Sequence, residues 1–235
     1  MARRRPMHPS DRRKFDRLLD APTGGTLRLR TTPAGRVTML INGRSIGTIA
    51  GDIADRIGLR SGRPWTPELA LRVSKALEDD IAQEAATRLL AQRERSTGEL
   101  IARLKRRGVK PDKAERLVAS LEHKGEVDDA RFAELLARSI LRDKPAGARL
   151  IRSKLREKHV DRETARHATS AALQGRDALS DAIMLARSRL RAMGAAVDDR
   201  TKARRLLGLL ARRGFEEDTA MSAVRSLLRL QDAES

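Results

Sequence analysis

The sequence predicts a mainly α-helical protein, in which tandem three-helix repeats follow a small N-terminal β-hairpin or sheet. The first observation is a short basic element, LIARLKRRGV at residues 100–109, which returns as IRSKLREKHV at 151–160 and as LLGLLARRGF at 206–215. The second is that 40% of the residues are hydrophobic but only 2% are aromatic, so the core must be aliphatic, which is typical of packed helices. A period of roughly fifty residues is typical of arrays whose units bury their apolar faces against one another.

The N-terminal part of the chain carries the only strand signals. Residues 1–9 are strongly basic and are expected to form a disordered arm, which precedes an N-terminal region at residues 10–80. In residues 26–50 apolar and polar side chains alternate, and Asn42-Gly43 separates two alternating segments. Because alternation around Asn-Gly is the strongest short signal for a hairpin, we expect an antiparallel sheet of two or three strands that packs on the next helix.

From residue 51 onward the pattern predicts helices alone. A short helix is expected to end near Gly58, and Thr66 is expected to cap a longer helix that begins at Pro67. A break in this longer helix is expected near Asp79-Asp80, since aspartate commonly caps the exposed amide groups at a helix end.

Three repeats of three helices each are expected, at residues 81–127, 128–175 and 176–235. Their anchor leucines, Leu104, Leu155 and Leu210, lie 51 and 55 residues apart. The extra length of the third repeat falls in a loop near residues 193–199, where insertions are tolerated.

Capping signals mark the helix starts within these repeats. Ser96 with Glu99 three residues later is a capping box that opens the first basic helix. Either Asp128 or Asp129 is expected to cap the first helix of the second repeat, and Asp161 its third helix.

Charge follows the same period as the repeats. The chain has a formal net charge of +18, and the first two helices of each repeat are cationic while the third helix and its connector are mildly acidic. Stacking in register would join these helices into one cationic stripe for a polyanionic partner, whereas the plainer alternative is a solvated face that only keeps the chain soluble. The candidate binding residues are the cations of each second helix: Arg103, Lys105, Arg106, Arg107, Arg149, Arg152, Lys154, Arg156, Arg204, Arg205, Arg212 and Arg213.

Signals for catalysis are missing from the sequence. It contains no GxxxxGK[ST] phosphate loop, no GxGxxG after a strand and no GxSxG elbow. It has no cysteine, and its four histidines lack metal-ligand spacing; His159 takes the place that Gly108 and Gly214 hold in the other repeats, and we expect it to end a helix. The pairs Asp79-Asp80 and Asp128-Asp129 are interpreted as caps. We therefore predict that the protein is not an enzyme and carries no catalytic residue, metal or cofactor.

The scarcity of aromatic residues limits the kind of nucleic-acid contact. Trp65 is expected to anchor a turn and Phe132 to lie in the core, so neither is available to stack on bases. Contacts to DNA would go to phosphates and would be sensitive to salt and indifferent to sequence. No run of apolar residues is long enough to span a bilayer, and we expect a cytoplasmic monomer without a membrane partner.

These residues resemble the RecX family of bacterial recombination regulators over about residues 26–228. The most specific part is RERSTGELIARLKRRGV, followed by a helix and GEVDDARFA; a weaker series continues through Gly147, Leu150, Leu155 and Val160. The matching positions are Arg95, Ser96, Glu99, Leu100, Leu104, Arg107, Gly108, Asp128, Asp129, Arg131, Phe132 and Ala133. The chain departs from the family pattern in the low aromatic content of its second repeat, in His159, and in the loop insertion of its third repeat.

The resemblance implies an elongated, curved array of three-helix repeats that binds the RecA–DNA filament. Family members of this kind regulate the RecA recombinase in DNA recombination, DNA repair and the SOS response, and inhibit its ATPase, strand-exchange and co-protease activities. Two alternatives remain open at this point. One is a sequence-independent DNA- or RNA-binding protein that acts through the basic stripe, and the other is an enzyme with an unrecognised site.

Overall fold

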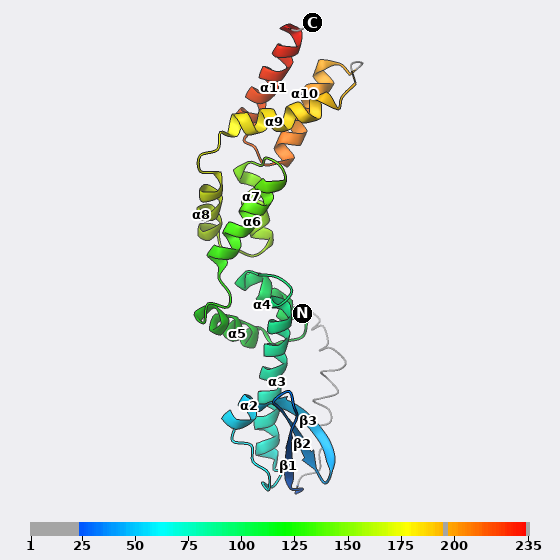
Figure 1. The fold of residues 1–235 in the computed structure, drawn as a ribbon, viewed down its shortest axis with the longest axis vertical. Helices are drawn as coiled ribbons and strands as arrows, with labels where there is room; N and C mark the ends of the chain where they lie inside the picture. The colour runs from blue at the N-terminus through cyan, green and yellow to red at the C-terminus, as the bar shows by residue number, and fades with distance from the viewer. Residues whose placement is uncertain (1–23, 195–196, 234–235) are drawn as a thin grey trace, which may run out of the picture. The chain divides into compact units, whose positions relative to one another are not determined.

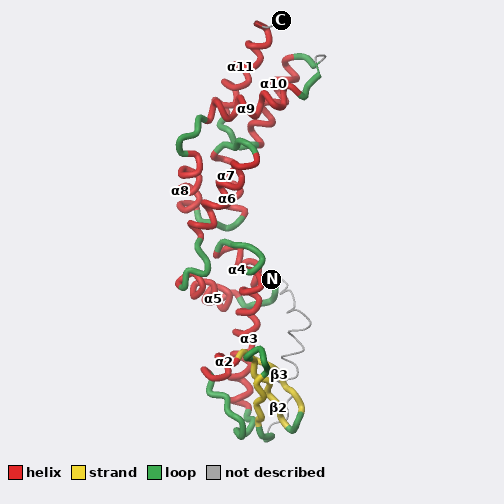
Figure 2. Tube along the Cα trace, viewed as in Figure 1, coloured by secondary structure: helices red, strands yellow, loops and turns green. Residues whose placement is uncertain are grey.

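The computed structural model describes residues 24–194 and 197–233, which divide into two compact units (Figure 1). The N-terminal unit contains residues 24–94 and 100–126, and the C-terminal unit contains residues 95–99 together with the described residues from 127 onward. The predicted basic arm at residues 1–9 lies outside the described residues. Figure 2 shows that the described strands lie in one short N-terminal segment and that helices joined by loops follow it.

The N-terminal unit begins with a three-stranded antiparallel sheet in the order β1-β2-β3. Asn42 and Gly43 both have positive φ, 52° and 79°, as the predicted two-residue hairpin turn requires. The sheet predicted from alternation is confirmed. Its strands are β1 (Leu27–Thr31), β2 (Arg36–Ile41) and β3 (Arg44–Ala50).

One face of the sheet packs on α2 (Gly51–Arg56) and α3 (Pro67–Leu90) to form the core of this unit. Thr66 caps α3 as predicted, because its Oγ1 accepts a hydrogen bond from the backbone N–H of Leu69. Trp65 is only 1% exposed and belongs to this core, and its backbone pairs with residues 24 and 25, so it anchors the turn as expected.

The predicted helix break at Asp79-Asp80 is wrong, because α3 runs through both residues without interruption. The buried Asp80 carboxylate lies 2.5 Å from Nη2 of Arg36, whose Nη1 also reaches Glu84 at 2.7 Å. Burial raises the pKa of Asp80, and the bond from Arg36 opposes that shift. Asp79 pairs with Lys113 at 2.8 Å. These carboxylates are neutralised by side chains and cap no helix end, so the boundary placed after residue 80 lies inside a helix.

The remaining helices confirm the three-helix repeats. The second half of α3 serves as the first helix of repeat 1, while α6 packs on α7 and α8, and α9 packs on α10 and α11 (Figure 1). The bounds are α4 (Thr97–Arg106), α5 (Pro111–His123), α6 (Asp129–Asp143), α7 (Ala148–Glu157), α8 (Arg162–Leu173), α9 (Ala178–Arg191), α10 (Asp199–Arg212) and α11 (Glu217–Ala233).

Aspartate caps open the helices of the C-terminal unit. Asp128 accepts a hydrogen bond from the N–H of Arg131 and caps α6, and Asp161 accepts from two amides at the start of α8. Both caps were predicted. Hydrogen bonds from Thr164 hold the pKa of Asp161 below its ordinary value.

The helix α7 begins without a side-chain cap, at Gly147. Its first amide groups instead donate to the C-terminal end of α10: Gly147 N–H bonds to the carbonyl of Arg213 at 2.9 Å, and Arg149 N–H bonds to that of Gly214 at 3.2 Å. We call this contact the α10–α7 joint. It satisfies exposed donors at the start of one helix with exposed acceptors at the end of another, and it brings the negative end of one helix dipole to the positive end of the other.

A similar contact lies at the other end of α7. His159 has φ of 59°, which confirms that it ends the helix where the other repeats use glycine. Gly98, in the first turn of α4, lies so close that a Cβ there would come within 2.5 Å of the His159 Cβ. Ser96 donates its hydroxyl hydrogen bond to the carbonyl of Lys158. The same arrangement therefore occurs twice in the C-terminal unit. The start of α4 contacts the end of α7, and the start of α7 contacts the end of α10.

We predict that Gly147→Ser destabilises the C-terminal unit, although serine is normally the better N-cap. A Cβ at Gly147 would overlap the backbone of Gly214 and Phe215, and such overpacking costs about 1–3 kcal/mol. Urea unfolding followed by far-UV circular dichroism measures the loss. Gly194→Ser is the control, because a Cβ at Gly194 meets nothing within 4 Å. Equal stability of the two variants would contradict the joint.

Candidate functional site

A groove rich in arginine lies on the C-terminal unit between α7, α8 and α10. Its volume is about 960 Å³, and small or aliphatic residues, among them Ser153 and Ala165, line it between the guanidinium groups. We define the arginine groove by its six arginines: Arg149, Arg152, Arg156, Arg162, Arg166 and Arg212.

Helical spacing places these arginines. Arg149, Arg152 and Arg156 are spaced three and four residues apart, so they share one face of α7, while the buried Ile151 and Leu155 occupy a different face. Arg162 and Arg166 are one turn apart on α8. Arg212 ends α10, and the α10–α7 joint holds this end of the helix against the start of α7.

The electrostatics of the groove favour an anion. None of the described residues that line it carries a carboxylate. The acidic side chain paired with it, Glu216, lies 4.0 Å from both Arg149 and Arg152 and is itself largely exposed. Guanidinium groups present planar forks of donors that match phosphate and carboxylate groups, so the groove can bind several such groups at once.

A second hollow of about 820 Å³ shares Arg152 and Arg166 with the arginine groove. His167, Ser170 and Gln174 of α8 and the loop after it contribute polar side chains. A polar surface therefore continues along α8, beyond the arginine groove.

Four of the twelve predicted binding residues lie together in the groove: Arg149, Arg152, Arg156 and Arg212. Lys154 lies on α7 but pairs with Glu157 at 3.0 Å. Arg204 and Arg205 are exposed on α10 and are not among the residues that line the groove.

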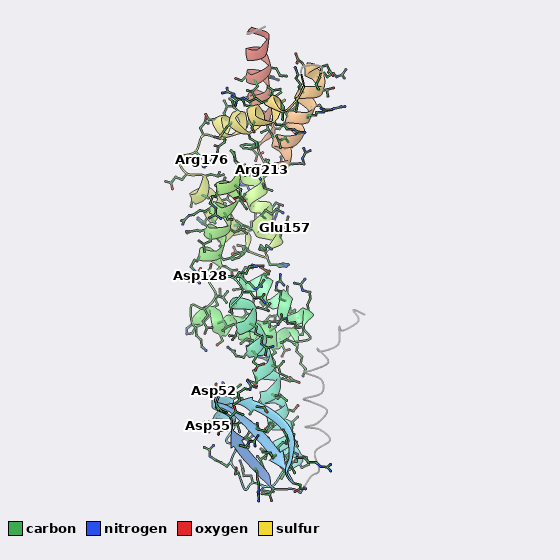
Figure 3. The ribbon with its side chains drawn as sticks, turned by 45° about the vertical axis from the view of Figure 1, so that its right-hand side comes forward. Asp52, Asp55, Asp128, Glu157, Arg176 and Arg213 are labelled. Carbon is green, nitrogen blue, oxygen red and sulfur yellow. The ribbon has the colours of Figure 1, made fainter. Side chains whose placement is uncertain are left out.

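Arg213, another of the predicted binding residues, makes contacts within the fold. Its Nε donates to the carbonyl of Pro145 at 2.9 Å and its Nη2 to that of Lys144 at 2.6 Å. Arg213 lies beside the α6–α7 connection (Figure 3), where its guanidinium holds the loop before α7 and supports the joint. Two hydrogen bonds from one guanidinium to backbone carbonyls stabilise this part of the fold.

The predicted residues of repeat 1 belong to the N-terminal unit. Lys105 pairs with Glu115 at 2.7 Å, and Arg106 and Arg107 are exposed at the end of α4. Arg103 is half-buried on the same helix. Acidic neighbours also pair with the lysines of α5 and the residue before it, so this cationic surface is partly neutralised.

Sequence reasoning missed Arg162 and Arg166. Both lie on a third helix, and each third helix counted together with its connector is mildly acidic, which directs attention to the other helices. The acids are concentrated at helix starts, where Asp161 and Asp177 act as caps, so the count concealed a cationic face. The spacing of four residues between the two arginines was the available signal.

Several residues of the most specific sequence motif hold helices together. Arg95 and Glu99 form a buried ion pair at 2.9 Å, and Ser96 accepts a hydrogen bond from the N–H of Glu99, which confirms it as the cap of α4. Asp129 bonds to both the N–H and the hydroxyl of Thr97, at 2.7 and 2.8 Å. The motif therefore ties the first turn of α4 to α6 and α7.

Residues 24–194 and 197–233 carry neither a grouped set of metal ligands nor a membrane-spanning helix. In this part of the chain no three His, Cys, Asp or Glu side chains are grouped so that they could hold a metal ion. No helix there is both long and apolar enough to cross a membrane.

Comparisons with known proteins agree on one family. Residues 82–121 match the family model for the first three-helix domain of RecX, and residues 128–168 match the model for its second three-helix domain. The regulatory protein RecX of Amycolatopsis mediterranei is 37% identical over 157 residues, which cover 66% of this chain and 87% of that protein. The regulatory protein RecX of Mycobacterium avium is 33% identical over 154 residues, which cover 64% and 87%.

Solved structures share the fold. A crystal structure of regulatory protein RecX aligns with a TM-score of 0.64 and 17% identity, over 83% of this chain and 96% of that one. The crystal structure of RecX from Lactobacillus salivarius aligns with a TM-score of 0.53 and 19% identity, over 64% and 96%.

We predict that the neighbouring variants Arg213→Gln and Arg212→Gln differ in stability. Losing Arg213 leaves the carbonyls of Pro145 and Lys144 without their charged donor, at a cost of about 1–2 kcal/mol, whereas losing the exposed Arg212 changes the free energy of unfolding by less than about 0.5 kcal/mol. Circular dichroism in urea measures both variants. The single tryptophan, Trp65, reports on the N-terminal unit alone and should show an unchanged fluorescence transition. Equal losses in both variants would contradict these assignments.

Proposed function

The chain belongs to the RecX family of regulatory proteins, and we propose that it binds the filament that the RecA recombinase forms on DNA and inhibits its activity. The activities concerned are ATP hydrolysis, strand exchange and the co-protease activity, within DNA recombination, repair and the SOS response. We propose that the protein acts in the cytoplasm as a monomer, and that it inhibits by binding and catalyses no reaction itself.

The observation that carries this proposal is the combination of family membership with a cationic groove built by successive repeats. A filament of recombinase on DNA is a long polyanion with a regular repeat. A chain that carries similar cationic helices in each repeat can contact such a target at several points, and linked contacts give a higher avidity than any one of them alone.

The second candidate function, a sequence-independent binder of DNA or RNA, is favoured by the arginine groove itself. Its six arginines would attract any nucleic-acid backbone, with or without RecA. The two functions differ in the stoichiometry they predict, because a general binder must cover the DNA while a filament regulator acts on the filament at a few points.

We predict that the protein inhibits ATP hydrolysis by RecA when it is present at well below one molecule per RecA subunit. The measurement is steady-state ATPase of RecA assembled beforehand on single-stranded DNA, with bare DNA in excess as a competitor. Inhibition that persists under the competitor supports direct action on the filament.

Inhibition that appears only at amounts sufficient to coat the DNA would overturn this proposal in favour of the general binder. The double variant Arg187→Gln/Arg189→Gln, which changes exposed arginines of α9 outside the groove, should inhibit as the wild type does. It controls for a simple effect of net charge.

A further inference from the structure

We infer that the arginine groove is a site for the sugar–phosphate backbone of a nucleic-acid strand, and that α8 supplies one of its two walls. This inference deepens the proposed function and rests on it where the strand is the DNA of the RecA filament. It assigns phosphate contact to a site formed by three helices, two of which belong to repeat 2 and one to repeat 3.

The dimensions of the groove suit several phosphates in a row. The arginines of α7 run from Arg149 to Arg156, which corresponds to about 10 Å at 1.5 Å per residue along a helix. One strand of duplex DNA carries one charge per about 3.4 Å of axis, so a row of this length faces about three phosphates. Arg162 and Arg166 on α8 and Arg212 at the end of α10 surround the same space.

The residues that line the groove favour a sugar–phosphate backbone over a protein surface as its ligand. Between the arginines lie Ser153, Ala165, Ala211 and Gly214, with Leu150 as the largest apolar residue. Hot spots of protein interfaces combine arginine with tryptophan and tyrosine, and none of the residues that line the groove is aromatic, so the arginines stand without the apolar anchors that accompany them at such interfaces. The same composition offers no platform for base stacking, so binding would be indifferent to sequence.

The protein's own acidic side chains compete only weakly with a phosphate for the arginines of the groove. Glu216 reaches Arg149 and Arg152 only at 4.0 Å and with an exposed carboxylate. By contrast, in the N-terminal unit Lys105 lies 2.7 Å from Glu115, and Lys113 lies 3.0 Å from Glu78. A phosphate therefore displaces fewer internal partners in the groove than on the surface of repeat 1.

The test compares two double variants of the full chain that remove the same charge. Arg162→Gln/Arg166→Gln removes the α8 wall, and Arg187→Gln/Arg189→Gln removes two exposed arginines of α9 outside the groove. Binding to a fluorescein-labelled oligothymidylate is measured by anisotropy over a range of KCl concentrations, without RecA. Far-UV circular dichroism confirms that both variants are folded.

The α8 variant is expected to lose affinity by about tenfold or more at low salt. Its slope of log affinity against log salt should fall by about 1.4, because each phosphate contact to a single strand contributes about 0.7. Arg162→Lys/Arg166→Lys should retain most of the slope. Glu216→Gln is expected to bind more tightly than the wild type, since it frees Arg149 and Arg152 from their nearest acid.

Equal losses in the α8 and α9 variants would overturn the groove as the phosphate site, and so would an α8 variant that binds the oligonucleotide as the wild type does. In the latter case an acidic protein surface would be the better partner for the groove. The failure of the proposed function gives a different result: the wild type would then bind oligothymidylate through the groove and still leave RecA ATPase uninhibited at low ratios.

Discussion

The close approach of two backbones, at Gly147 and Gly214, is the constraint on which the candidate site depends. The first N–H groups of α7 have no side-chain cap and find their acceptors on the end of α10, which requires that neither glycine carry a Cβ. Arg213 strengthens the same contact by bonding to the two carbonyls that precede α7. The joint brings Arg212 into the same groove as Arg149, so a feature of backbone packing contributes to the density of positive charge there.

Local signals in the sequence predicted much of the fold, because their causes are local. The hairpin at Asn42-Gly43, the cap at Thr66 and the end of α7 at His159 each follow from the dihedral angles or hydrogen bonds of a few adjacent residues. The predicted break at Asp79-Asp80 was wrong for the opposite reason. The partner of Asp80 is Arg36, which lies 44 residues away in the sequence, and no local pattern reveals that pairing.

The candidate site could be predicted only in part. Four groove arginines were found because they lie on the repeated cationic helices, but Arg162 and Arg166 required knowledge of how α8 packs beside α7. Arg213 was assigned to the binding surface from its charge, and its carbonyl partners lie 68 and 69 residues away. Within the motif that carries the family resemblance, Arg95, Ser96 and Asp129 hold helices together. The proposed phosphate contacts lie elsewhere.

The most direct measurement places a photocrosslinking amino acid, p-benzoylphenylalanine, at Ser153 inside the arginine groove, and at Ser188 on the exposed face of α9 as the control. Each protein is irradiated with RecA filaments assembled on end-labelled single-stranded DNA. The account predicts a labelled DNA adduct from position 153 and little from position 188. Adducts from position 153 to RecA subunits alone, or equal DNA adducts from both positions, would contradict it.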